Sequence, residues 1–338
     1  MEPEKGRLCE RFSARRRPVV RSATVRFARY PGESAKIIFA PVFIALERGY
    51  FRDEGLNVEI VEPSDHPWQS VASGESDAGV AYIDFCARPE YRDRFKAVAV
   101  QERLTKGRGL PALLARPPLI DDGSLREESG LRGRVLGLTW GRGDDYLTYA
   151  FVLRRGGLAL RDVRYVAVPH EGEERRNMLA RGEIDVIINR RPRAVADEEA
   201  RGVLRRWKVG GEIENPWQNR FIIFSTAFMQ HSPAAGRAFL RAHQRGVAAY
   251  VEGTMNGSPD AAFLPELSRL SSETAELLTG SRPAGFPIDS QIHMASLSRD
   301  VQLLKEVELF PREIDVEAVI DQTFSPHESF AGTKIASD

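Results

Sequence analysis

The segment Ser64-Asp65-His66-Pro67-Trp68 holds the side chains best suited to acid–base chemistry. A histidine such as His66 exchanges its proton near neutral pH, and Asp65 is its neighbour in the chain. Trp68 could stack on an aromatic ligand. The same residues also fit the start of a helix, with Ser64 or Asp65 as the N-cap and Pro67 in the first turn. His66 and Asp65 are therefore candidate catalytic residues, and Trp68 a candidate ligand-binding residue, beside this structural alternative.

A second histidine–carboxylate pair, His170-Glu171, follows the apolar stretch 163–169. If the two pairs lie on opposite sides of a ligand cleft, closing of the cleft would exclude water and shift their pKa values toward the working pH. His170 and Glu171 are therefore further candidate catalytic residues.

The stretch TWGRGDDYL, residues 139–147, predicts a glycine-containing turn that opens a helix. Free backbone N–H groups and the positive end of the helix dipole would attract an anion there. Arg142 could grip a carboxylate or sulfonate with two hydrogen bonds. The alternative is a plain turn with Asp144 or Asp145 capping the helix. The pattern lacks the third glycine of a dinucleotide-binding fingerprint.

Ligands of open α/β sheets bind beyond the carboxyl ends of the strands. That rule selects the loops after six expected strands, three in each half of the chain. The candidate ligand-binding residues in these loops, with those of the glycine turn, are Tyr30, Glu33, Ser34, Trp68, Tyr82, Asp84, Trp140, Gly141, Arg142, Gly143, Asp144, Asn189 and Arg190.

The elements that must position these residues alternate between strand and helix patterns. β-branched or alternating stretches predict strands at 23–29, 57–62, 78–82, 96–101, 111–115, 134–139, 163–169, 185–189 and 221–224. Helical spacing predicts helices at 37–49, 68–73, 146–155 and 173–180, and a long helix from Pro233. Such alternation is typical of the α/β class, with mostly parallel sheets flanked by helices.

One helix-to-strand joint occurs twice, as SVASGESDAGVAY at 70–82 and NMLARGEIDVIIN at 177–189. Gly74 and Gly182 would end their helices in the left-handed conformation that glycine tolerates best. The repeat predicts two similar α/β lobes, and the joint itself is architecture rather than a site. We expect a flexible N-terminal arm at 1–21, a discontinuous first lobe at 22–115 and 221–338, and a second lobe at 116–220.

The composition narrows the function classes. Lys and Arg total 48, as do Asp and Glu, and this zero balance argues against a nucleic-acid partner. The two cysteines, Cys9 and Cys86, form no metal-binding spacing, and no cofactor is expected. The N-terminus has no apolar core of a signal peptide, and the apolar run 37–46 is too short to span a membrane. The sequence as written predicts a cytoplasmic protein, or an exported one if the start is misassigned.

Two segments, IALERGYFRDEGLNVEIVEP at 44–63 and ASGESDAGVA at 72–81, resemble one large superfamily. It contains the substrate-binding proteins of nitrate, sulfonate and taurine transporters and the thiamine-pyrimidine-synthase-like proteins. The resemblance spans roughly residues 22–325. It implies a two-lobed type II periplasmic-binding fold, with the second lobe inserted into the first and a ligand cleft between them.

That superfamily also includes cytoplasmic enzymes. The segment RYVAVPHEGEERRNMLARGEIDVIINRRP at 164–192 looks like its dihydroxyphthalate decarboxylase branch, and the tail at 303–326 is similar to both branches. The cysteine-rich motif of the pyrimidine synthases is absent. The loop Tyr30–Lys36 has neither their histidine nor the nucleophilic cysteine of the desulfinases, so both chemistries lose support.

Three functions remain open. The first expectation is a cytoplasmic lyase, of decarboxylase type, acting on a small aromatic or heteroaromatic acid in the interlobe cleft. The alternative is the substrate-binding protein of an ABC transporter, which grips a sulfonate, nitrate, taurine or aromatic carboxylate without catalysis. A cytoplasmic ligand sensor is the third. In each case the expected partner is a small anionic or aromatic molecule, without nucleic acid or membrane insertion.

Overall fold

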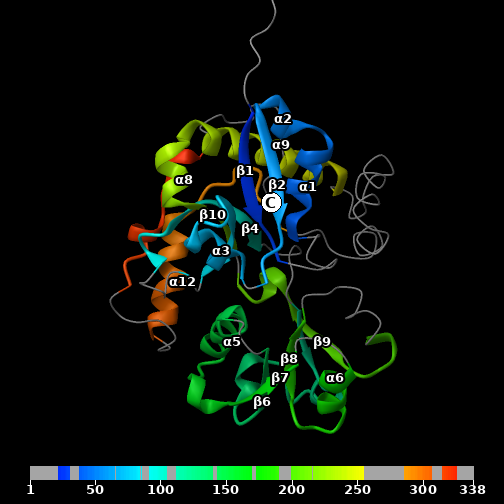
Figure 1. The fold of residues 1–338 in the computed structure, drawn as a ribbon. Coiled ribbons are helices and arrows are strands. Elements are labelled where there is room, and N and C mark those ends of the chain that lie inside the picture. Colours follow the sequence, from blue (N-terminus) through cyan, green and yellow to red (C-terminus); the bar gives the residue numbers. More distant parts are fainter. Residues whose placement is uncertain are drawn as a thin grey trace, which may run out of the picture.

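The computed structural model describes residues 22–30, 38–64, 66–83, 85, 91–104, 112–139, 143–169, 173–189, 199–214, 216–254, 285–306 and 314–325. They form two lobes, each built around a five-stranded sheet with helices against it (Figure 1). The predicted two-lobed α/β class is therefore confirmed.

The sheet of the first lobe has the strand order β2-β1-β3-β10-β4. Its strands are β1 (Ala23–Ala28), β2 (Leu56–Val61), β3 (Ala78–Tyr82), β4 (Phe95–Leu104) and β10 (Trp217–Ser225). β1 is parallel to β2 and β3, whereas β10 is antiparallel to both of its neighbours. Four of the five strands thus share one direction. Val25 and Phe27 alternate with more exposed residues in β1 and point into the same core, as the period of a strand requires.

The sheet of the second lobe repeats this plan, in the order β7-β6-β8-β5-β9. Its strands are β5 (Ala112–Ala115), β6 (Val135–Thr139), β7 (Arg164–Val168), β8 (Val186–Asn189) and β9 (Arg205–Val209). β6 is parallel to β7 and β8, and β5 is antiparallel to β8 and β9. In each sheet the reversed strand occupies the fourth position.

Each reversed strand lies next to a point where the chain passes from one lobe to the other. β5 is the first strand after the chain leaves the first sheet, and β10 is the first after it returns. Residues 112–115 were expected in the first lobe but pair within the second sheet, and 217–220 were expected in the second lobe but pair within the first. The boundaries between the lobes, as the strand pairing defines them, therefore differ by a few residues from both predicted boundaries.

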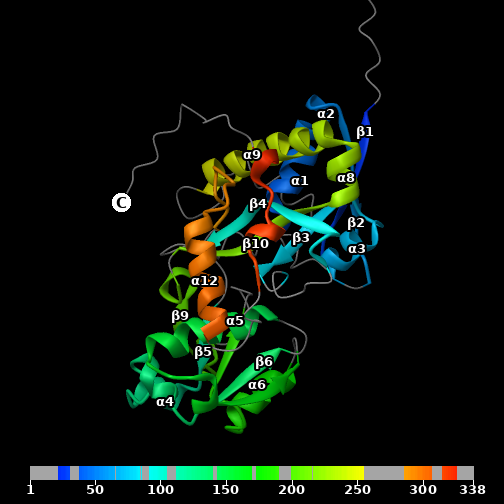
Figure 2. The same cartoon turned by 90° about the vertical axis from the view of Figure 1, so that its left-hand side faces the viewer.

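Helices cover both faces of each sheet (Figures 1 and 2). α1 (Ala40–Glu47), α2 (Tyr50–Asp53) and α9 (Pro233–Thr254) cover one face of the first sheet, and α3 (Pro67–Ser73) and α12 (Met294–Glu306) pack on the other. In the second lobe, α5 (Gly143–Arg155) and α6 (Glu173–Ala180) pack on opposite faces. The described residues also form α4 (Pro117–Asp121), α8 (Thr226–His231) and the short 3-10 helices η4 (Glu128–Leu131), η5 (Leu160–Asp162), η6 (Gly210–Glu212), η7 (Glu317–Val319) and η8 (Gln322–Phe324).

The crossing of α1 and α9 depends on a glycine. A Cβ atom on Gly246 would lie 2.1 Å from the carbonyl oxygen of Pro41, so only glycine lets these two helices approach so closely. Both helices bury apolar residues against the first sheet, where Phe27 and Phe239 stack with their ring centres 5.5 Å apart.

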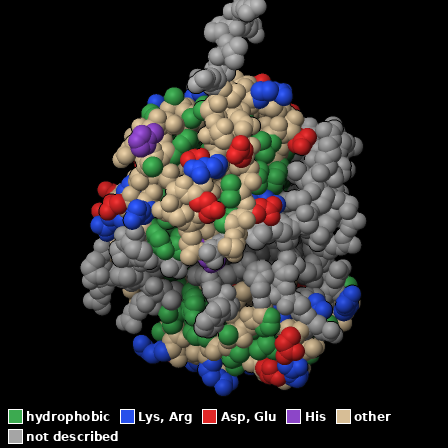
Figure 3. All heavy atoms as spheres, in the orientation of Figure 1, with side chains coloured by type: hydrophobic (Ala, Val, Ile, Leu, Met, Phe, Trp, Pro, Cys, Tyr) green, Lys and Arg blue, Asp and Glu red, His purple; other side chains and the backbone are tan. Residues whose placement is uncertain are grey.

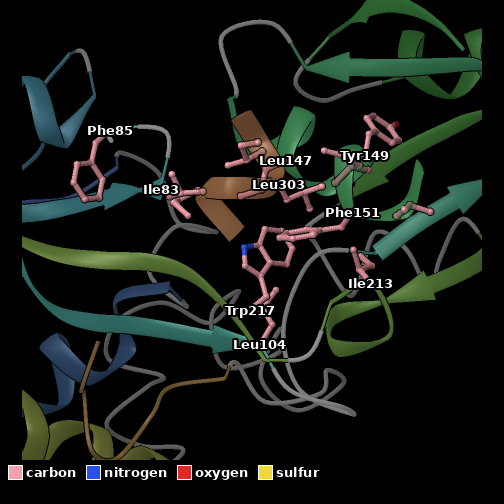
Figure 4. Close-up of a cluster of buried hydrophobic side chains, with 14 of the residues drawn as sticks. Ile83, Phe85, Leu104, Leu147, Tyr149, Phe151, Ile213, Trp217 and Leu303 are labelled. Atoms are coloured by element: carbon pink, nitrogen blue, oxygen red, sulfur yellow. The ribbon is translucent and has the colours of Figure 1, made fainter. Parts of the chain in front are cut away.

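One apolar cluster joins the lobes (Figure 4). The fully buried Trp217, at the start of β10, packs against Phe151 of α5 with ring centres 5.2 Å apart. Leu303 of α12 belongs to the same cluster, and α12 runs alongside α5 in Figure 2. α12 therefore contacts both lobes, beside the segment where the chain returns to the first sheet.

The repeated Gly-Glu-x-Asp joint has the same structure in both lobes. Gly74 and Gly182 adopt left-handed conformations, with φ values of 83° and 73°, and end α3 and α6 as predicted. Asp77 and Asp185 then each bond to the neighbouring strand. Their backbone N–H groups donate to the carbonyl oxygens of Arg26 and Val135, and their carboxylates accept the backbone N–H of those same residues. The recurring aspartate thus fixes the register between neighbouring strands.

The described part of the chain contains no helix long and apolar enough to cross a membrane. On the face shown in Figure 3, acidic and basic side chains are interspersed rather than gathered into a patch of one sign.

Candidate ligand-binding site

Four of the predicted site residues gather at the carboxyl ends of the first-lobe strands. Tyr30 follows β1, His66 and Trp68 stand at the start of α3, and Tyr82 ends β3. The Tyr30 ring lies 6.2 Å from the His66 ring and 6.0 Å from the Tyr82 ring, and His66 stacks on Trp68 at 5.7 Å. We call these four residues the aromatic wall. It offers ring faces and edges suited to a planar or apolar ligand.

The wall is exposed to different degrees along its length. His66 is exposed, Tyr30 and Tyr82 are half-buried, and Trp68 is buried against Tyr91 with ring centres 4.7 Å apart. His66 is itself the N-cap of α3, and its backbone N–H donates to the side-chain oxygen of Gln69 at 3.0 Å. The segment therefore does start a helix, as the structural alternative predicted, but the N-cap is His66 and not Ser64 or Asp65.

Two buried arginines lie beside the wall. The Arg29 side chain pairs with Glu62, and its Nη1 donates to the carbonyl oxygen of Tyr30 at 2.8 Å. The Arg220 guanidinium lies 5.6 Å from the centre of the Tyr82 ring and pairs with Glu102. Each guanidinium is paired with a carboxylate, so these arginines fix the polar groups at the strand ends beside the wall.

The Arg220–Glu102 pair is part of a fully buried polar cluster. Arg220 Nε donates to Glu102 Oε2 at 2.9 Å, and Arg220 Nη2 donates to the same oxygen. Asn219 Nδ2 also donates to this oxygen, at 2.8 Å. The backbones of Arg220, Tyr82 and Glu102 are paired across three adjacent strands, so the cluster lies at the same end of the sheet as the wall.

The second lobe presents polar groups at the corresponding strand ends. Asn189 is the last residue of β8 and is half-buried. Next to it, the buried Arg175 of α6 donates from Nη2 to the carbonyl oxygen of Ile188. The buried carboxylate of Asp145 accepts the backbone N–H of Thr139 at 2.9 Å, and thereby ties the start of α5 to the end of β6. This bond is to a residue of β6, so it does not test the alternative in which Asp144 or Asp145 caps the helix.

Tyrosines stabilise the interior of this lobe. Tyr149 donates its hydroxyl to the carbonyl oxygens of Gly137 and Val186, and it packs near Tyr165 with ring centres 6.4 Å apart. Burial of the Tyr165 hydroxyl raises its pKa above the ordinary value, because the phenolate would lose its hydration. Tyr165 is thus neutral throughout the physiological range.

Most of the remaining predictions lie outside the described residues. These are the candidate catalytic residues Asp65, His170 and Glu171 and the candidate ligand-binding residues Glu33, Ser34, Asp84, Trp140, Gly141, Arg142 and Arg190, together with the side-chain environments of Gly143 and Asp144. Their roles stay predictions. Among the described residues, no group of three or more His, Cys, Asp or Glu side chains could hold a metal ion.

Sequence reasoning missed the buried cluster around Arg220. A signal was present, because Gln101-Glu102-Arg103 and Gln218-Asn219-Arg220 interrupt otherwise apolar strands. Polar residues inside a buried strand need partners, and each triplet is the natural partner of the other. The expected strand 96–101 ended at the first residue of one triplet, and the expected strand 221–224 began after the other, so their pairing was not foreseen.

Comparison with known proteins agrees with this architecture. The family model described as NMT1/THI5 like matches residues 36–91, from the approach to α1 to the residue that packs on Trp68. The comparison with curated proteins gives no match.

Solved structures match over nearly the whole chain. The periplasmic aliphatic sulphonate binding protein SsuA from Escherichia coli is 14% identical, with a TM-score of 0.65 over 93% of this chain and 97% of that one. The alkanesulfonate-binding protein SsuA from Xanthomonas axonopodis pv. citri, bound to MOPS, is 15% identical, with a TM-score of 0.63 over 88% and 98%. The enzyme DszB, in complex with biphenyl-2-sulfinic acid, is 14% identical, with a TM-score of 0.60 over 90% and 97%.

At these identities the likeness establishes the fold. The chain has the type II periplasmic-binding fold, as the sequence resemblance implied.

Proposed function

We propose that this protein binds a small organic anion between its two lobes, as the substrate-binding component of an ABC transporter. The observation that carries the proposal is the aromatic wall at the carboxyl ends of the first-lobe strands, with the guanidinium of Arg220 5.6 Å from the Tyr82 ring. Structural neighbours that are sulfonate-binding proteins support the same class of ligand.

The wall suits an anion that also has an apolar or aromatic body. Ring contacts contribute about 0.5–1.5 kcal/mol each beyond the area that they bury. The two buried arginines hold the strand ends beside the wall, each through its pair with a glutamate. Closing of the second lobe over the ligand would remove the remaining water. These contributions give binding and selectivity without a proton transfer.

The expected decarboxylase chemistry has no comparable support. Of the four candidate catalytic residues, only His66 lies in the described part of the chain, where it caps α3 and stacks on Trp68. A transporter's binding protein works outside the cytoplasm, so this proposal implies export instead of the cytoplasmic location expected from the sequence as written. Fractionation of cells expressing the full-length protein would distinguish the two locations.

A ligand screen tests the proposal. The purified protein is melted with a panel of aliphatic and aromatic sulfonates, aromatic carboxylates and nitrate, and each hit is measured by titration calorimetry. We expect at least one organic anion to raise the melting temperature, because a ligand of the native state stabilises it by mass action. Mass spectrometry after incubation with excess protein should return that ligand unchanged. A product that has lost the mass of CO2 would instead establish a decarboxylase, and the absence of any organic-anion hit would contradict the proposal.

A further inference from the structure

One segment after α9 is bonded to the chain at both places where it passes between the lobes. It comprises residues 285–306, which include α12, and we call it the brace. Its first contact is with the end of β4, where the chain leaves the first sheet. The backbone N–H of Arg103 donates to the carbonyl oxygen of Gly285 at 2.7 Å. The Arg103 guanidinium donates to Asp289 at 3.1 Å and to the carbonyl oxygen of Gln291 at 2.7 Å.

The second contact of the brace is with the start of β10 and the residues before it, where the chain returns to the first sheet. Gln218 of β10 donates to the carbonyl oxygen of His293 at 2.9 Å and accepts the His293 backbone N–H at 2.9 Å. Arg299, in the middle of α12, donates to the carbonyl oxygen of Pro216 at 3.2 Å and pairs with Glu214 at 3.2 Å. The brace therefore holds the returning chain at two points, one before β10 and one within it.

Beyond these contacts, α12 continues to the second lobe (Figure 2). Leu303 belongs to the apolar cluster that also holds Phe151 of α5, and Glu306 lies 3.9 Å from Arg154 of the same helix. Because α12 is bonded to the returning chain and packed on the second lobe, a rotation of that lobe about this point has to shift the contacts between α12 and α5. The brace is therefore placed to restrain the movement of the lobes.

The contact of the brace that can change is the one made by Arg299, because two carboxylates share its guanidinium. Arg299 Nη2 lies 3.2 Å from Glu214 and 3.0 Å from Asp300 Oδ1. Asp300 is fully buried, and within the described structure its Oδ2 has no hydrogen-bond partner. A neutral carboxyl tolerates such a position, whereas an ionised one is destabilised by its incomplete hydrogen bonding and by the second carboxylate nearby.

Two charged groups of the described structure act on Asp300, one of each sign. Burial raises the pKa of Asp300 to about 7, the charge of Glu214 adds to the rise, and Arg299 opposes it. The elements beside α12 also carry Arg154 of α5, which pairs with Glu306, the uncharged Gln218 of β10, and Glu317 of η7, which lines one pocket with Met294 at the start of α12. Asp300 therefore changes its charge near neutral pH at the point where the brace holds the returning chain.

We propose that the brace restrains the movement of the lobes and that ionisation of Asp300 loosens it. While Asp300 is neutral, Arg299 bonds to Pro216 and Glu214 and holds the returning chain against α12. Once Asp300 is ionised, it competes with Glu214 for the same guanidinium, and it gains water only if α12 moves away from the returning chain. The lobes of the ligand-free protein should therefore be held in one arrangement below pH 7 and move more freely above it. The inference deepens the proposed function and rests on it in one respect: lobe movement that depends on pH makes ligand binding depend on pH.

Interlobe distances test the inference on the ligand-free protein. Spin labels are attached to Gln230→Cys on α8 and Ala180→Cys on α6, two exposed helical positions in different lobes, after Cys9 and Cys86 have been replaced by serine. Pulsed EPR should give a narrow distance distribution at pH 6 and a clearly wider one at pH 8, with the midpoint of the change near pH 7. A distribution that is the same at both pH values would overturn the inference.

Three variants connect the change in distance to the Arg299 contact. Asp300→Asn removes the charge and should give the narrow distribution at both pH values. Arg299→Gln removes the bonds to Pro216 and Glu214 and should give the wide distribution even at pH 6. The matched control is Glu317→Gln, which removes a carboxylate near the start of α12 and should respond to pH as the parent does. A pH response that persists in Asp300→Asn, or a narrow distribution of folded Arg299→Gln at pH 6, would contradict the assignment, and melting curves verify that each variant is folded.

Binding kinetics connect the brace to the proposed function. Benzenesulfonate is a suitable probe, because it carries its charge at both pH values. A lower barrier to lobe movement speeds both association and release, so we expect both rate constants to be several-fold higher at pH 8 than at pH 6 in the parent and unchanged in Asp300→Asn. Equal rate constants in the parent at the two pH values would show that the brace does not control ligand binding. If the distances respond to pH but neither benzenesulfonate nor any other organic anion of the ligand screen binds, the proposed function fails and the role of the brace stands.

Discussion

Asp185 and Val135 exchange two hydrogen bonds at the entrance to β8. The backbone N–H of Asp185 donates to the Val135 carbonyl oxygen at 2.7 Å, and the Asp185 carboxylate accepts the Val135 backbone N–H at 2.8 Å. The other carboxylate oxygen accepts Nε of Arg116 at 3.0 Å. One side chain thereby links the helix-to-strand joint, the neighbouring strand β6 and the residue that precedes α4.

Replacing Asp185 with alanine should destabilise the protein. The change leaves the buried N–H of Val135 without its acceptor, which costs about 1–3 kcal/mol. Urea denaturation of the variant and the parent measures the loss. Asp53→Ala is the matched control, because its pair with Arg245 is on the surface and should contribute less than about 1 kcal/mol. An equal loss of unfolding free energy in the two variants would contradict the stabilising role of the Asp185 carboxylate.

Replacing Tyr82 with alanine should weaken ligand binding while leaving the fold intact. The variant removes the half-buried ring at the end of the wall that lies beside Arg220. We expect affinity for an aromatic sulfonate to fall about tenfold, which corresponds to about 1.4 kcal/mol. Tyr50→Ala serves as the control, since this tyrosine packs against Arg245 of α9 instead of the wall. A similar loss of affinity in both variants would argue that the ligand binds elsewhere.

Asp300 should make the stability of the protein depend on pH. Its carboxyl is fully buried in α12, and burial raises its pKa to about 7 despite the hydrogen bonds from Arg299. Glu214, which also pairs with Arg299, adds to the rise. Because the pKa of the folded state is raised above 3.8, the contribution to stability is fully present below about pH 4 and is lost as pH rises through 7.

The variant Asp300→Asn isolates this effect. It keeps an oxygen for Arg299 and removes the charge, so it should match the parent near pH 4 and exceed it by about 2–4 kcal/mol near pH 8. Chemical denaturation at several pH values measures both. Glu306→Gln in the same helix, whose surface pair with Arg154 spans 3.9 Å, should follow the parent at every pH. If Asp300→Asn is the less stable protein at pH 8, the ionised carboxylate is stabilising and this prediction is wrong.

His243 should make the protein less stable at low pH, whereas Asp300 should make it less stable at high pH. It is fully buried in α9 beside Phe239, and burial lowers its pKa to about 4. The folded state therefore resists protonation, so stability is present above the ordinary pKa of 6.5 and is lost as pH falls through 4. In the parent, protonation of His243 should lower the free energy of unfolding by about 2–3 kcal/mol as the pH falls. In His243→Leu this acid-induced loss of stability should be absent. The control His231→Leu changes an exposed histidine and should lose stability at low pH as the parent does. The same loss in His243→Leu would contradict the assignment of this pH dependence to His243.

The sequence predicts most of the helices and strands, because residues close together in the chain determine where each one begins and ends. Gly74 and Gly182 mark the ends of α3 and α6, Pro233 marks the start of α9, and α6 has the predicted bounds 173–180. The strand β9 was not predicted, because Arg205-Arg206-Trp207-Lys208-Val209 has too little apolar alternation to indicate one.

Long-range pairing could not be predicted in the same way. The buried contact between Arg220 and Glu102 joins residues 118 positions apart, and the local pattern around each residue gives neither the register nor the geometry of that contact. By contrast, the gathering of Tyr30, His66, Trp68 and Tyr82 followed from one general rule about the carboxyl ends of parallel strands. Whether His66 is catalytic stays a prediction.

The reversed strands have a consequence for the order of folding during synthesis. The second sheet is complete in the chain once residue 209 has been made, since all of its strands lie between residues 112 and 209. The first sheet still lacks β10 at that moment, although its other four strands emerged much earlier. The inserted lobe can therefore fold on the ribosome while β3 and β4 still have unpaired edges, and a chaperone that shields those edges would act during this interval.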